Sequence, residues 1–527
     1  MWIKRYVKLS LFLLFLFLLL YNLIKGDIMY VNNKILVGKN DKKEVYLLPN
    51  MANRHGLITG ASGTGKTVTL KVMAESFSDC GIPVFMVDVK GDLAGTAFMG
   101  VENENVSSRV EKLKLDGFKY DRYPCVFLDT YGKNGHPVRT TVQNMGHRLI
   151  SKMLNLSDTQ DSVLAIVFKI AKDENKPLND LEDLQSMLNY VSQNKNKYTD
   201  NYGSIATQSI GTIQRNVIEF MDKVEDNFFG TPSFDYNHLI NTSLETGKGR
   251  ISILDAQVLF NYPDSYVSMV LWVLNSLYDN LPEVGDLDKP KIVFFFDEAH
   301  LLFNNMPKAV VDHVIQVVKL IRSKGVGLYF ISQSPSDIPN EVLSQLGNKV
   351  QHALRAYTPS EQKAIKAAAD GFRTNPEFDT KEAIQNLGTG EALVSFLGEK
   401  GDPNVVEKVT ILPPQSKMGA ITEEERKMVI NNSPIANIYE TRTNEISAKE
   451  MNEEEMNKIN EEKQEELNKK EQEKLDKEAA KEKARQEKEA AKKAKNDPMR
   501  KLGKKITGKA TDRIINRFLN RILKNFK

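Results

Sequence analysis

The stretch that decides the fold is Gly60-Ala-Ser-Gly-Thr-Gly-Lys-Thr67, which fits the phosphate-binding pattern G-x-x-x-x-G-K-[ST] at every fixed position. The short apolar run from His55 to Thr59 precedes this loop, and the amphipathic stretch from Val68 to Phe77 follows it. A strand before the loop and a helix after it bring backbone N–H groups and a positive helix end to the phosphates, so the stretch predicts a nucleoside triphosphate site. The loop alone does not say what the phosphate energy does, since kinases, GTPases, transporters and nucleic-acid motors share it.

Each position of the loop has an expected role. Lys66 is expected to reach the β and γ phosphate oxygens, and Thr67 to offer its hydroxyl to Mg²⁺. The glycines let the backbone turn so that successive N–H groups face the phosphates. The residues that we expect to contact ATP are Gly60, Ala61, Ser62, Gly63, Thr64, Gly65, Lys66, Thr67 and Val68.

A second motif lies far downstream in KIVFFFDEAH, residues 291–300, where an apolar strand ends in two acids. Open α/β sheets place ligands at the carboxyl ends of their strands, so Asp297 is expected to hold Mg²⁺ through water. Glu298 is expected to orient and deprotonate the attacking water. This second acid favours ATPases with an additional strand and a catalytic glutamate over kinases and GTPases. Acids that compensate the dipole of a following helix are the alternative explanation.

Two further polar residues flank the next apolar strand, Gly327 to Ile331. Gln333 follows this strand, where an amide beside the γ-phosphate would sense hydrolysis; a turn residue that satisfies backbone groups is the alternative. Arg322 lies in the last turn of the preceding helix, which Gly325 closes. It is either a cation that complements the helix dipole or an arginine finger offered to the nucleotide of a neighbouring subunit.

Five ordered segments between about Tyr30 and Pro414 together resemble the bacterial helicase HerA-like family, in the HerA/FtsK branch of P-loop ATPases. The segments are RHGLITGASGTGKTVTLKVMAE, PVFMVDVKGDLAG, NGHPVRTT, FFFDEAHLLF and LIRSKGVGLYFISQSPSDIPNEVLSQLGNKVQHALRAYTP. The resemblance implies a RecA-like core and ATP hydrolysis with Mg²⁺. It also implies a homo-oligomeric ring, typically hexameric, with nucleotide between subunits, and DNA as the substrate of a translocase or helicase.

The resemblance also assigns residues by motif. It makes Gln333 the sensor and Arg322 the finger, and it adds Asp88 and Lys90 to the residues that line the nucleotide site. Archaeal HerA has a β-barrel before its phosphate loop, whereas 59 residues precede Gly60 here. We therefore expect no full-size barrel, which argues against the nuclease-partnered role in DNA-end resection.

Strand-like apolar runs alternate with helical patterns from Gly56 to about Leu412, which is typical of a mostly parallel sheet covered by helices. We therefore expect an α/β, RecA-like P-loop domain over residues 29–414, with a helical insertion at about 142–241. The expected strands are Leu57 to Thr59, Val84 to Val87, Val126 to Leu128, Ile251 to Leu254, Ile292 to Phe296, Gly327 to Ile331, Val350 to Leu354 and Ala392 to Phe396.

The N-terminal 28 residues contain an apolar run, Leu9 to Ile24, that is short for a membrane span. This leader is an uncleaved anchor, lies shallowly in the membrane or turns back within it, or is absent because translation starts at Met29.

Beyond the ATPase domain the composition changes twice. After an expected linker at 415–444, residues 445–496 are almost wholly charged or polar, which predicts a solvated helix or a tether rather than a coiled coil. Residues 497–527 show a basic amphipathic pattern that fits self-docking or oligomer contact, an anionic membrane surface or nucleic acid. Membrane contact is expected, if at all, through residues 9–24 or 499–527.

Composition narrows the classes of function. The net charge is only +3, which is too small for a nucleic-acid footprint over the whole surface. Cys80 and Cys125 have no metal or redox spacing, so we expect reduced, buried cysteines in a cytoplasmic protein. The seven histidines lack ligand spacing, which excludes a metal-dependent hydrolase without nucleotide. A ring motor on DNA remains, and the alternative is a membrane-associated ATPase that acts on a protein partner or works as a nucleotide-dependent switch.

Overall fold

The computed structural model describes residues 29–222, 228–304, 306–356, 358–443 and 445–495. The chain separates into two compact units, residues 1–449 and 450–527. The expected apolar leader and the basic amphipathic helix lie outside the described ranges. Within those ranges, no helix is long and apolar enough to cross a bilayer.

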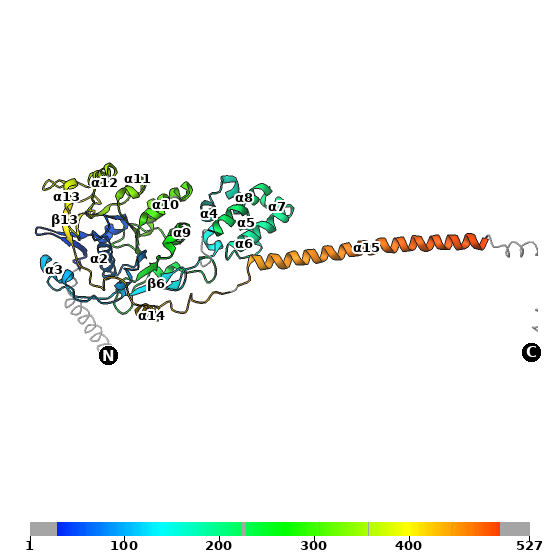
Figure 1. Cartoon of the computed structure of the whole chain (residues 1–527), viewed down its shortest axis with the longest axis horizontal. Coiled ribbons are helices and arrows are strands. Elements are labelled where there is room, and N and C mark those ends of the chain that lie inside the picture. The colour runs from blue at the N-terminus through cyan, green and yellow to red at the C-terminus, as the bar shows by residue number, and fades with distance from the viewer. Residues whose placement is uncertain (1–28, 223–227, 305, 357, 444, 496–527) are drawn as a thin grey trace, which may run out of the picture. The chain divides into compact units, whose positions relative to one another are not determined.

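A thirteen-stranded sheet forms the centre of the first unit, and its parallel part confirms the expected α/β class (Figure 1). The strand order is β1-β2-β13-β12-β11-β4-β10-β9-β5-β8-β6-β7, with β3 paired to β2. The side chains of the parallel strands are almost all buried, which explains their continuous apolar runs. The parallel strands are β4 (Gly56–Thr59), β5 (Val84–Asp88), β6 (Cys125–Asp129), β7 (His136–Pro137), β8 (Ile251–Asp255), β9 (Ile292–Phe296), β10 (Val326–Ser332) and β11 (Asn348–Gln351).

The end of β11 corrects one sequence expectation. The apolar run predicted a strand from Val350 to Leu354, but β11 ends at Gln351. The following residues leave the sheet, and the N–H of Ala61 donates to the carbonyl of Ala353 at 2.9 Å. The strand prediction was wrong at this end because the run continues into a segment that contacts the phosphate loop.

An antiparallel group extends the sheet beyond β11. β12 pairs antiparallel with β11, β13 with β12, and β2 with β13. β3 and β13 were not among the expected strands. The strands of this group are β1 (Tyr30–Val31), β2 (Lys34–Lys39), β3 (Glu44–Leu47), β12 (Glu391–Ser395) and β13 (Glu407–Ile411).

The helix that follows the phosphate loop, α2 (Lys66–Asp79), packs against the centre of the sheet. Its fully buried Phe77 contacts Phe295 of β9 and Tyr329 of β10, with ring centroids 6.1 and 5.8 Å apart. This contact ties the last turn of the helix to the strands that precede the downstream motifs. The other helices of this region are α3 (Glu104–Leu113), α9 (Pro263–Asn280), α10 (Lys308–Leu320), α11 (Asn340–Leu343), α12 (Pro359–Asp370) and α13 (Thr380–Asn386).

Five helices gather between β7 and β8, in the part of the chain where only helical patterns were found (Figure 1). Capping boxes at Ser157 and Asp180 start α5 and α6. The helices are α4 (Val142–Met153), α5 (Asp158–Asp173), α6 (Leu181–Gln193), α7 (Lys195–Tyr202) and α8 (Thr207–Met221).

Residues 415–443, where we expected a linker, belong to the first unit and pack against the rest of it. The backbone N–H of Gln415 donates to the buried carboxylate of Glu75 in α2 at 2.8 Å. The segment then forms α14 (Glu423–Asn431) and buries Tyr439. The polar composition of this segment gave no indication of these long-range contacts.

The last described helix is α15 (Ala448–Lys495), which covers most of the charged, low-complexity region. Every side chain from residue 460 to residue 493 is exposed. Its apolar residues are too sparse for a heptad seam, in line with a single solvated helix.

Candidate nucleotide site

The phosphate loop joins the end of β4 to the start of α2. Gly63 and Gly65 have φ values of 76° and 118°, a region that residues with a Cβ rarely adopt. Gly65 is the N-cap of α2, so the loop ends where the free N–H groups of the helix begin. The local backbone therefore has the anion-binding form that the motif predicts.

Lys66 lies at the first position of α2 and is buried. Its Nζ donates to the carbonyls of Gly60 and Ala61, at 2.5 and 3.1 Å. Burial lowers the pKa of Lys66, and the negative charge of nearby Glu298 opposes that shift. The lysine is therefore held inside the loop, within the field of the downstream acid.

The acidic pair lies at the tip of β9, which is separated from β4 by β10. This is the additional strand that the two acids in series indicated. Asp297 is buried, and burial raises its pKa to about 6 while Lys90 lowers it. Lys66 and the acids thus share one edge of the sheet, at the carboxyl ends of parallel strands.

Glu298 has a strained backbone and an available carboxylate oxygen. Its φ and ψ are 48° and 47°, the left-handed region, which costs on the order of 1–3 kcal/mol for a residue with a Cβ. Its Oε2 is buried and receives no hydrogen bond from the described residues, although His300 Nδ1 lies 3.5 Å away. Such an oxygen is able to accept a proton from a water molecule.

Lys90 reaches both acids of the pair. Its Nζ lies 3.2 Å from Glu298 Oε1 and 4.0 Å from Asp297 Oδ2. The structure therefore places Lys90 in the site that the resemblance implied.

Asp88 has a different position from Lys90. Its carboxylate accepts hydrogen bonds from the backbone N–H groups of Gly91, Asp92 and Leu93, at 2.7, 3.2 and 3.0 Å. Burial raises its pKa to about 6. Asp88 therefore shapes the turn that carries Lys90, rather than presenting its oxygens to a ligand.

Arg322 and Gln333 lie at opposite ends of strand β10. Gln333 follows β10, is exposed, and comes directly after Ser332, which pairs with Thr59 before the phosphate loop. Arg322 lies in the short 3-10 helix η6 (Ile321–Lys324) before β10. Burial lowers its pKa, and neighbouring Arg54 lowers it further. The structure thus brings Gln333 to the phosphate loop but places Arg322 away from the loop of its own chain.

Sequence reasoning missed the residues that hold the phosphate loop from behind. His352 Nδ1 lies 2.9 Å from the carbonyl of Glu391, and its Nε2 lies 2.8 Å from the hydroxyl of Thr69. A carbonyl only accepts, so Nδ1 carries the proton and Nε2 accepts from Thr69. Burial lowers the pKa of His352 to about 4, which keeps the ring neutral. This role of His352 is visible only from its contact with Thr69, which lies 283 positions away in the sequence.

His352→Gln is expected to remove part of the acid sensitivity of the fold. An unfolded histidine titrates near 6.5 and His352 near 4, so its contribution is complete above pH 6.5 and is lost as the pH falls toward 4. Between pH 7.5 and pH 5 this residue alone costs the wild type about 2 kcal/mol of unfolding free energy. Denaturant unfolding at both pH values measures it. His55 and His313 remain in both proteins, so their similar contributions cancel; an identical pH dependence would contradict the assignment.

Asp337 is a second residue that the sequence did not single out. Its Oδ2 accepts from the hydroxyl of Ser332 at 2.6 Å and from the N–H of Ser334 at 2.9 Å. It fixes the turn that carries Gln333. The signal for it was available in the capping-box pattern of Ser334-Pro-Ser-Asp337.

A phosphate loop after one parallel strand, and an Asp-Glu pair after a second parallel strand with one more strand between the two, define a P-loop ATPase with an additional strand. Cys80 and Cys125 are free and buried, as the sequence predicted. The family model described as Helicase HerA-like C-terminal matches residues 33–525, and the chain belongs to this family.

Similar proteins include archaeal helicases. The chain is 22% identical over 365 residues to the DNA double-strand break repair helicase HerA of Sulfurisphaera tokodaii, covering 67% of this chain and 64% of that protein. It is 23% identical over 384 residues to the HerA of Sulfolobus acidocaldarius, covering 72% and 67%. The match thus spans less than two thirds of the length of the first of these relatives.

Two solved structures are also similar to the chain. The bacterial conjugative coupling protein TrwB, without its N-terminal 70 residues, is 14% identical, with a TM-score of 0.47 over 74% of this chain and 95% of that chain. VirB4 of Thermoanaerobacter pseudethanolicus is 16% identical, with a TM-score of 0.45 over 75% and 99%.

Proposed function

We propose that the protein hydrolyses ATP with Mg²⁺ and uses the energy to move DNA as a homo-oligomeric ring. The observation that carries the proposal is the shared site of Lys66, Asp297 and Glu298 at one edge of the sheet. Family membership among HerA-like helicases supports the motor class. The match spans only part of the length of the relatives, so the DNA substrate belongs to the proposal.

The residues at this edge fit Mg²⁺. Thr67 is partly exposed, and its hydroxyl takes part in no hydrogen bond within the described residues. Asp297 adds a carboxylate, and Mg²⁺ in nucleotide sites is typically held by one or two such side chains together with phosphates. Thr67 and Asp297 would hold the ion, which would neutralise charge on the β and γ phosphates.

The chemistry that this chain supplies is positioning, charge and proton transfer. Lys66 leaves the loop carbonyls to bind phosphate oxygens, which replaces two neutral acceptors with an anion. Glu298 Oε2 takes the proton of the attacking water. Gln333, beside the loop, contacts the γ-phosphate and senses its loss.

The position of Arg322 supports assembly into a ring. It precedes β10, whereas the phosphate loop lies level with the other end of that strand, and the seven residues of β10 span roughly 20 Å. An arginine side chain does not bridge that distance. Arg322, with Arg54 beside it, therefore serves the nucleotide of a neighbouring subunit, and by family analogy we expect a hexamer.

Duplex DNA is expected to stimulate ATP turnover by the full chain, and the stimulation is expected to fall steeply with salt. A motor that contacts six to ten phosphates loses about 10³- to 10⁵-fold in affinity between 50 and 200 mM salt, because bound counterions are released. Phosphate release with and without DNA, over a salt series, measures this.

A rate that ignores DNA at every salt concentration would contradict the motor proposal. If the protein in that case sediments with anionic liposomes, the result would favour the membrane-associated alternative. No observation on the described residues supports that alternative. A chain that starts at Met29 is the matched control, because it separates the leader from the described ATPase unit.

A further inference from the structure

Arg109 on α3 lies against the wall of the phosphate loop. A Cβ added to Gly390 would come within 2.3 Å of Arg109 Nη2, so the guanidinium rests directly on Gly390. The N–H of Gly390 in turn donates to the carbonyl of Thr64 at 2.9 Å. A Cβ on Gly65 would meet the Cα of Gly390 at 3.2 Å. One glycine therefore separates the Arg109 guanidinium from the loop.

The guanidinium has no counterion in the described part of the chain. It is partly buried, and no hydrogen bond or ion pair to it is found among the described residues. Burial lowers the pKa of Arg109, yet an arginine stays charged in any protein environment. The charges of Arg109 and Lys66 both act on the imidazole of His352, so the two cations approach the same ring.

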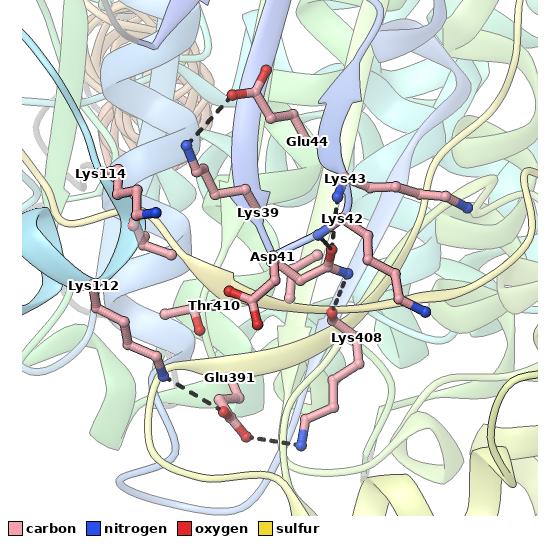
Figure 2. Close-up of a pocket in the computed structure, with 13 residues that line it drawn as sticks. Lys39, Asp41, Lys42, Lys43, Glu44, Lys112, Lys114, Glu391, Lys408 and Thr410 are labelled. Atoms are coloured by element: carbon pink, nitrogen blue, oxygen red, sulfur yellow. Dashed lines mark hydrogen bonds and ion pairs between the residues drawn. The ribbon is translucent and has the colours of Figure 1, made fainter.

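The neighbouring carboxylate is already occupied. Glu391 lies 3.9 Å from Lys112, one turn further along α3, and 3.2 Å from Lys408 (Figure 2). These residues line a pocket of about 680 Å³. In the same pocket Lys39 pairs with Glu44 at 3.6 Å. Lys39, Lys112 and Lys408 of this pocket thus have carboxylate partners, whereas Arg109 beside them has none among the described residues.

A partly buried cation without a partner is stabilised by an external anion, because its loss of hydration is otherwise uncompensated. The anion that the loop brings to this place is the nucleotide. Lys66 reaches the β and γ phosphates, and loop N–H groups surround the α and β phosphates. Arg109 approaches the loop at Gly65, through Gly390. Gly65 is the residue from which α2 starts, where loop and helix N–H groups meet the phosphates.

We propose that Arg109 donates to the α-phosphate of the nucleotide bound in the phosphate loop of the same chain. The proposal rests on the proposed ATPase function and adds a binding residue that neither the motifs nor the resemblance supplies. Arg109 binds and does not take part in proton transfer, so it acts on affinity for ATP and ADP alike.

The test is equilibrium binding and turnover by the full chain with Arg109→Gln. A hydrogen bond between charged groups contributes enough for a loss of about ten- to a hundredfold in affinity, for ATP, ADP and inorganic tripolyphosphate alike. KM for ATP rises by a similar factor, while kcat changes far less. Lys112→Gln, on the same helix but paired with Glu391, is the matched control and is expected to bind as the wild type does.

Each other outcome overturns this assignment. Unchanged affinity removes Arg109 from the site, and a fall in kcat at unchanged affinity gives it a catalytic role instead. If Arg109→Gln weakens the binding of ATP but not of tripolyphosphate, Arg109 contacts the nucleoside and not the α-phosphate. If Arg109→Gln does not fold, Arg109→Lys, which keeps the charge, is expected to show a smaller loss of affinity, and wild-type affinity there would argue against a specific guanidinium contact. A wild type that binds no ATP refutes the proposed function itself.

Discussion

Glu298→Gln is expected to abolish ATP turnover while ATP binding persists. Glutamine has nearly the same shape as glutamate but does not accept the proton of the attacking water. A positioned general base contributes about 10²- to 10⁴-fold, so kcat is expected to fall at least a hundredfold. The buried, unpartnered Oε2 of Glu298 is the observation behind this expectation.

Steady-state phosphate release and equilibrium binding of a fluorescent ATP analogue separate the two effects. Glu341→Gln, an exposed acid in the first turn of α11, is the matched control and is expected to keep full activity. Hydrolysis by Glu298→Gln at the wild-type rate would remove Glu298 from its proposed role.

The second large effect is expected for Arg322→Ala. Arginine fingers contribute about 10³- to 10⁵-fold in rate, which corresponds to roughly 4–7 kcal/mol of barrier. Arg322 pairs only loosely with exposed Asp286 at 3.9 Å, so the substitution is expected to leave stability almost unchanged. Arg373→Ala is the control, because Arg373 is exposed and also has a 3.9 Å ion pair, to Asp402.

A mixture of two inactive variants tests whether Arg322 acts between subunits. In a mixed ring, an Arg322→Ala subunit supplies the phosphate loop and Glu298, and its Glu298→Gln neighbour supplies Arg322. The mixture is therefore expected to regain part of the wild-type rate. A mixture as inactive as each variant alone would contradict the proposed interface.

The parallel strands of the sheet, apart from the two-residue β7, were predictable because each is buried on both faces. IVFFF at Ile292–Phe296 is an unbroken apolar run, and the sequence marks it without ambiguity. β13 (Glu407–Ile411), by contrast, begins with a glutamate and a lysine, and only its last three residues are buried. β7 has only two residues, His136–Pro137, which leaves no periodicity to detect. Short or one-sided strands need their partners to be recognised.

The candidate site was predictable where one side chain follows directly from a strand end. Lys66 and Asp297 belong to that class, and the structure brings them to the same edge. Spacing did not distinguish Asp88, which shapes a turn, from Lys90, which reaches the acids, because both follow the same strand. His352 acts through contacts across the sheet that no local pattern encodes.

The most direct test of the account is a structure of the full chain with Mg²⁺ and a non-hydrolysable ATP analogue. The account predicts the γ-phosphate on Lys66, the metal ion beside Thr67 and Asp297, and the carboxylate of Glu298 within reach of a water in line with the γ-phosphate. A triphosphate bound elsewhere, or one bound in the loop with the acids out of reach of its γ-phosphate, would contradict the central claim.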